Sequence, residues 1–186
     1  FYARHPNWSM VGKAIWDGQR ALDVLGAVDD VDATRLGAVG HSLGVHGAMF
    51  VAAFDDRVKA SVSSCGIASW HDNALRTKWA RDEWYVYFQP LRPVFKAGKP
   101  NPFDVWHFAA LIAPRAFLNI SGMTDRTYGR NDLLPEVGLH LQEVYERVGA
   151  PERFANFLFG AGHDVPRYSR TLTVGWFEAW LADVAV

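Results

Sequence analysis

The sequence contains a single cysteine, Cys65, so it can form no internal disulfide bond and no cysteine-rich zinc site. It has no run of 18 uncharged apolar residues, which excludes a conventional membrane-spanning helix. The positive and negative charges nearly cancel, because the sequence has 19 Lys and Arg residues and 20 Asp and Glu residues. We therefore expect neither a nucleic-acid partner nor a membrane partner. The glycine-rich patterns that cradle phosphates are missing too, so no nucleotide is implied.

The composition is that of one globular domain. The chain has 186 residues, of which 49% are hydrophobic and 21% are charged, enough to build a sizeable core. Aromatic residues make up 14% and include 8 Trp, which requires a large core or an aromatic-lined cavity. The first residue is Phe1, and no signal-peptide pattern follows it. We expect an N-terminally incomplete or processed chain.

Helices and strands alternate along most of the sequence. Ser9 is a suitable N-cap for the first helix, whose apolar residues recur every three or four positions. The patterns predict helices over about 10–26, 43–54, 134–148 and 166–182, and strands over 35–40, 58–64, 115–121 and 153–159. Strands that alternate with helices predict an α/β fold, with a parallel sheet covered by helices on both faces.

Residues 67–107 interrupt this alternation. The segment mixes aromatic residues such as Trp70, Trp79 and Tyr87 with charged residues and four prolines. A structureless loop of this length is uncommon inside a compact domain. We predict a lid-like insertion with some helix; the alternative is an irregular segment packed on the surface.

A nucleophile motif lies between the first predicted strand and the second helix. The run Gly40-His41-Ser42-Leu43-Gly44 matches G-x-S-x-G, and its strand-to-helix context is the one that a nucleophile elbow requires. The elbow holds the serine in a strained turn, and we expect side chains at both flanking glycines to collide with the neighbouring strand and helix. The N–H of Leu43 is the expected oxyanion donor. The alternative is a buried serine in a glycine-rich turn.

Two later residues can complete a catalytic triad. His163 comes directly after the last predicted strand, and Asp125 follows the third strand, so both belong to the carboxyl edge of the sheet. Asp132 is a rival acid but lies farther from its strand. We expect Ser42 to attack, His163 to carry the proton and Asp125 to orient the imidazole. His46 is expected to be a half-buried or buried histidine with satisfied hydrogen bonds, and Cys65 a small buried residue.

These segments resemble a known superfamily. Gly40–Gly44, Gly122–Asp125 and Gly162–His163 are similar to the three catalytic segments of the α/β-hydrolases. The helix and loop before the elbow resemble those of dienelactone-hydrolase-like and acetyl-xylan-esterase-like members. The likeness runs from about residue 10 to 183, apart from the aromatic insertion. It implies a serine hydrolase that needs no cofactor or metal.

The resemblance also implies eight strands with the elbow after the fifth, whereas four are visible here. We therefore expect 1–186 to be one catalytic domain that lacks its N-terminal strands and its oxyanion loop. The strand at 35–40 would then be an open edge, through which the chain could self-associate. The expected substrate is a small carboxylic ester. The alternatives are a peptide or amide bond, or a non-catalytic relative that only binds its ligand.

Overall fold

A computed structural model describes residues 1–71, 74–81, 87–97 and 101–182. Its centre is a four-stranded parallel sheet with the order β1-β2-β3-β4. The strands are β1 (Leu36–His41), β2 (Val58–Ser64), β3 (Ala116–Gly122) and β4 (Phe154–Phe159). Each begins within about one residue of the predicted start, and the prediction of a parallel α/β fold is confirmed.

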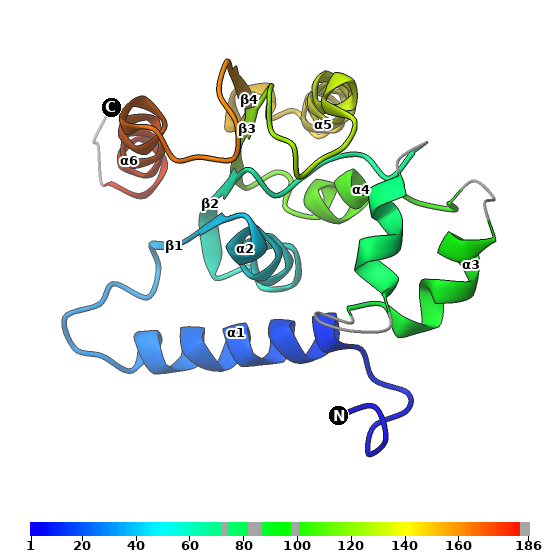
Figure 1. The fold of residues 1–186 in the computed structure, drawn as a ribbon. Helices are drawn as coiled ribbons and strands as arrows, with labels where there is room; N and C mark the ends of the chain where they lie inside the picture. The colour runs from blue at the N-terminus through cyan, green and yellow to red at the C-terminus, as the bar shows by residue number, and fades with distance from the viewer. Residues whose placement is uncertain (72–73, 82–86, 98–100, 183–186) are drawn as a thin grey trace.

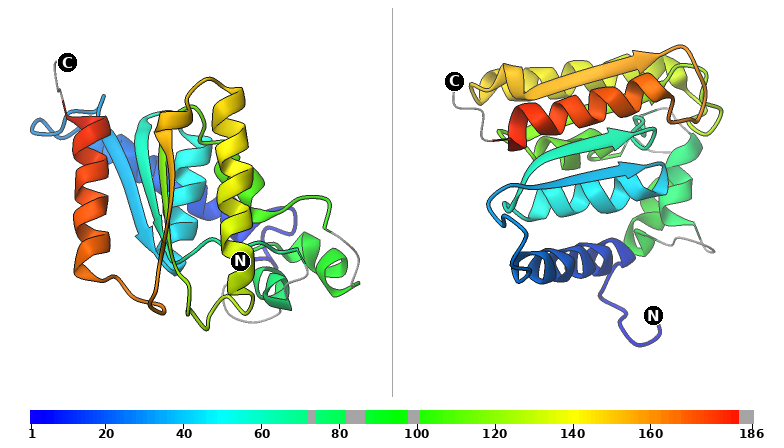
Figure 2. Two further views of the ribbon diagram at one scale, coloured as in Figure 1. Left: turned by 90° about the horizontal axis from the view of Figure 1, so that it is seen from above. Right: turned by 90° about the vertical axis from the view of Figure 1, so that its left-hand side faces the viewer.

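Helices cover both faces of the sheet (Figures 1 and 2). One face carries α2 (Leu43–Phe54) and α5 (Leu134–Arg147), and the other carries α6 (Arg167–Leu181). The first helix, α1 (Met10–Gly26), packs against α2 on the side away from the sheet. Ser9 caps α1 as predicted, accepting a hydrogen bond from the N–H of Gly12 at 3.0 Å. No helix in the described ranges is both long and apolar enough to cross a bilayer.

The hydrophobic core has two parts, one on each face of the sheet. Helix α2 is apolar on nearly all sides and inserts Val45, Met49 and Phe50 into the larger part. The smaller part lies under α6 and contains Val62, Leu118 and Ile120 from the central strands, among other residues. These two parts hold the sheet from both faces, and the carboxyl ends of its strands carry the candidate site.

The predicted insertion contains short helical elements, while residues 72–73, 82–86 and 98–100 of it lie outside the described residues. The elements are the 3-10 helices η1 (Ala74–Ala80) and η2 (Gln89–Leu91) and the α-helices α3 (Arg92–Lys96) and α4 (Val105–Ala110). Part of its aromatic content is core, because Trp70 is 1% exposed and joins the cluster that contains Phe50. A role as a lid remains a prediction.

One buried carboxylate ties the two ends of this segment together. Asp104 caps α4 and also accepts hydrogen bonds from the Ser69 hydroxyl at 2.6 Å and the Trp70 N–H at 2.9 Å. In return, the Asp104 N–H donates to Nδ1 of His107 at 2.9 Å. The chain that leaves β2 is therefore joined to the start of α4, although 34 residues separate Trp70 from Asp104.

Candidate active site

Ser42 occupies the sharp turn between β1 and α2. Its φ of 55° and ψ of −119° lie in a region that non-glycine residues rarely adopt. The turn is fixed to the sheet, because the Ser42 N–H donates to the carbonyl of Ser64 at 2.8 Å. The chain thus places the serine at the carboxyl edge of the sheet in the strained conformation of a nucleophile elbow.

The two glycines that flank the elbow have different roles. A Cβ at Gly40 would lie 2.0 Å from the carbonyl oxygen of Gly44, so no side chain fits there. A Cβ at Gly44 would meet nothing within 4 Å. The prediction that both positions exclude side chains is therefore wrong for Gly44, because the first turn of α2 points that position into open space.

Leu43 is the first residue of α2. The first N–H groups of a helix have no carbonyl partner within it, so they are available to a ligand. Leu43 also lines the same cavity as Ser42. An oxygen bound to the carbon that Ser42 attacks could accept a hydrogen bond from this backbone N–H.

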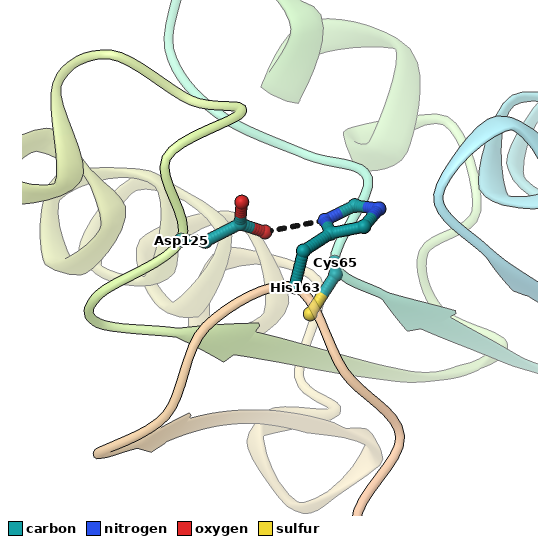
Figure 3. A group of neighbouring side chains, drawn as sticks. All are labelled: Cys65, Asp125 and His163. Atoms are coloured by element: carbon teal, nitrogen blue, oxygen red, sulfur yellow. Dashed lines mark hydrogen bonds and ion pairs between the residues drawn. The ribbon is translucent and has the colours of Figure 1, made fainter.

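Asp125 and His163 approach each other from the loops after β3 and β4 (Figure 3). Nδ1 of His163 lies 2.6 Å from Oδ2 of Asp125. The carboxylate is completely buried, whereas the imidazole is 28% exposed and lines the cavity beside Ser42. The aspartate can therefore orient the imidazole and leave Nε2 to accept the proton of a serine hydroxyl. In the described part of the chain the Ser42 hydroxyl makes no hydrogen bond to His163; catalytic hydrogen bonds are often long or poorly aligned before substrate binds.

Thr127 holds the other oxygen of the Asp125 carboxylate, and sequence reasoning missed it. Its backbone N–H donates to Oδ1 at 2.8 Å and its hydroxyl donates to the same oxygen at 2.6 Å. The Thr127 hydroxyl also lies 3.2 Å from His163 Nδ1. A threonine two residues after an aspartate is a common turn arrangement, so the spacing alone carried a weak signal.

The rival acid, Asp132, lies elsewhere. It pairs with Arg130 at 2.7 Å, and its side chain is 63% exposed. The hydrogen bond from Arg130 lowers the pKa of this carboxyl. Of the two acids considered, the structure brings Asp125 to the histidine.

A cavity of about 260 Å³ opens in front of Ser42 and His163. Part of its wall comes from the segment after β2, in particular Trp79, Tyr87 and the two cations Lys78 and Arg81. The sequence showed that the insertion contains both aromatic and charged residues, but it did not indicate that these residues line the site. Trp79 and Tyr87 pack against His46 of α2, a long-range contact that no local pattern reveals.

His46 stands one turn after Ser42 on α2 and faces this cavity. Its ring packs 4.1 Å from the Trp79 ring, measured between centroids, and 5.3 Å from that of Tyr87. Burial lowers the pKa of His46 to about 4, so the ring is neutral near pH 7. The prediction of satisfied hydrogen bonds is wrong for Nδ1, which is buried and has no partner in the described part of the chain.

His41 and Cys65 adjoin the Asp125–His163 pair. The His41 ring lies 4.8 Å from that of His163, and burial lowers the pKa of His41. Cys65 is buried, as predicted, with φ 53°, and burial raises the pKa of its thiol. Cys65, Asp125 and His163 could each offer a ligand atom to a metal ion, all within 4.8 Å of one another. The hydrogen bond between Asp125 and His163 already accounts for the placement of two of them.

Comparison with known proteins identifies the family to which this chain is similar. Residues 1–149 match the family model described as "Glucuronyl esterase, fungi". The chain is 30% identical over 177 residues to "Putative hydrolase YtaP" of Bacillus subtilis (strain 168), covering 92% of this chain and 54% of that protein.

Solved structures share the fold. A glucuronoyl esterase from Solibacter usitatus superposes with a TM-score of 0.78 at 23% identity, covering 92% of this chain and 49% of its own. The glucuronoyl esterase catalytic domain Cip2_GE from Hypocrea jecorina gives 0.77 at 20% identity, covering 93% and 52%. The chain therefore spans about half the length of these relatives.

Proposed function

The chain belongs to the glucuronyl esterase family, and we propose that it hydrolyses a carboxylic ester through an acyl-enzyme intermediate on Ser42. The observation that carries the proposal is the 2.6 Å contact between His163 Nδ1 and Asp125, beside a cavity that Ser42 and His163 both line. A base held by a buried acid next to a strained serine is the arrangement that activates a hydroxyl group for attack.

Each residue has a defined role in this reaction. Ser42 Oγ attacks the ester carbonyl while Nε2 of His163 takes the hydroxyl proton. The Leu43 N–H donates to the oxyanion, and the imidazolium, stabilised by Asp125, returns the proton to the departing alcohol. Water then attacks the acyl group by the same route, which releases the acid and restores Ser42.

We propose a sugar acid as the acyl part of the ester. Two of the solved relatives are named glucuronoyl esterases, and the cavity wall offers Trp79 and Tyr87. The apolar face of a sugar ring packs favourably against aromatic rings of this kind.

Labelling with a fluorophosphonate tests the nucleophile. We expect mass spectrometry to find one adduct, on Ser42, and Ser42→Ala to lose about 10⁴-fold or more of the p-nitrophenyl ester turnover. Cys65→Ser is the matched control, because it removes the other nucleophile of the site and should retain most activity. Full turnover in Ser42→Ala, or an adduct on Cys65 alone, would refute the assignment.

A further inference from the structure

Among the described residues that line the cavity in front of Ser42, the permanently charged side chains are all cations. Lys78 and Arg81 both line it, and none of its described lining residues is Asp or Glu. Burial lowers the pKa of His46 to about 4 and raises the pKa of Tyr128, so both of these lining side chains are neutral near pH 7. A cleft lined by charges of one sign attracts ligands of the opposite sign.

The wall that carries the two cations is firmly built. Trp79, next to Lys78, packs against Trp70 in the core, with the ring centroids 5.1 Å apart. The guanidinium of Arg92 donates to the carbonyls of Ala80 and Arg81, both at 2.7 Å. The backbone that positions both cations is therefore held from the core and from α3.

The ammonium group of Lys78 is available to a ligand. Lys78 is exposed at the cavity, and it forms no ion pair or hydrogen bond with any residue that the structure describes. A carboxylate at this point would gain charge-assisted hydrogen bonds from the ammonium and added attraction from the guanidinium of Arg81.

We infer that the ester substrate carries a free carboxylate in addition to the bond that is cleaved, and that Lys78 and Arg81 bind it. This inference rests on the proposed function, because it assigns the substrate class of the same cavity. It makes the two cations specificity-determining residues for an acidic ester. Since Lys78 is exposed, we expect a preference of about fivefold to tenfold in kcat/KM.

Two esters of similar shape test the inference. One is p-nitrophenyl hydrogen adipate; the other is p-nitrophenyl 6-methylheptanoate, in which an isopropyl group replaces the carboxylate. Release of p-nitrophenolate gives kcat/KM for each, with the spontaneous rate subtracted. We expect the ratio of the two values to fall toward one in Lys78→Met and in Arg81→Met, and also at about 0.5 M salt. Lys78→Arg, which keeps the charge, should retain most of the ratio.

Lys59→Met is the matched control. Lys59 is exposed near the amino end of β2, opposite to the cavity, and its ammonium donates to the Asp56 carbonyl at 2.8 Å. Its loss should leave the ratio unchanged. Equal kcat/KM for the two esters, with Ser42 still labelled by fluorophosphonate, would overturn this inference and leave the proposed function standing. Failure to hydrolyse either ester, with Ser42 unlabelled, would overturn the proposed function and this inference with it.

Discussion

The glycine before the elbow offers a quantitative test of how the serine is held. Gly40→Ala adds one methyl group, whose carbon would lie 2.0 Å from the carbonyl oxygen of Gly44 and 2.5 Å from the nitrogen of Val45. Ordinary van der Waals contact begins near 3.4 Å. The obstacles are backbone atoms at the start of α2, so no side chain can rotate away to relieve the contact. Either β1 or the first turn of α2 has to move by more than an ångström.

The free energy of unfolding should fall accordingly. Overpacking a core with an added carbon costs about 1–3 kcal/mol, and we expect Gly40→Ala to lie at or above the upper end of that range. Total stabilities of about 5–15 kcal/mol make this a large loss. Urea unfolding, followed by tryptophan fluorescence, measures it. Ester turnover should fall as well, because Ser42 is attached to the part that moves.

Gly44→Ala is the control, since it adds the same methyl group at the other flank of the elbow. Nothing lies within 4 Å of the new carbon, and alanine favours a helix over glycine by about 0.8–1 kcal/mol. We expect this variant to be as stable as the native chain or more stable. Equal destabilisation by the two substitutions would refute the reasoning, because it would mean that local backbone preference, not collision, dictates the glycines.

Two further predictions concern the acid and the buried histidine. Asp125→Asn should lower kcat for a p-nitrophenyl ester by about 10⁴-fold, because an amide favours the wrong imidazole tautomer, while Asp132→Asn should change it little; greater sensitivity at Asp132 would contradict the assignment. Because the pKa of His46 is lowered to about 4 in the folded chain, the unfolded chain takes up its proton first as pH falls from 6.5. His46 therefore contributes a loss of stability between pH 6.5 and pH 4, and His46→Gln should flatten that part of the curve in urea unfolding at stepped pH; an unchanged slope would argue against a neutral buried ring.

Local sequence patterns were sufficient for the sheet and for the positions of the candidate triad. The strand β2 and helix α2 have the predicted bounds, because apolar periodicity and flanking turns are encoded within each segment. The meeting of Asp125 and His163 followed from topology alone, since the carboxyl ends of neighbouring parallel strands share one edge.

What the sequence could not reveal depends on contacts between distant segments. Trp70 and Trp79 stand in the same aromatic stretch and both line the cavity, yet Trp70 is 1% exposed in the core whereas Trp79 is only partly buried. The unpartnered nitrogen of His46 arises because rings from beyond β2 pack against it. The space beside Gly44 could not be read from the motif either, because the motif specifies the turn and not its surroundings.

The carboxylate of Asp104 joins the two ends of the segment between Trp70 and α4 at one point. Because Ser69 and Trp70 at one end and α4 at the other meet at this group, the closure does not depend on what the intervening chain contains. A change of length in that stretch costs little, since loop-closure entropy grows only with the logarithm of the number of residues. The wall that faces Ser42 can therefore change at its exposed positions, while its buried residues Ala80 and Phe95 stay in the core and the strands that carry the serine, the acid and the histidine keep their register.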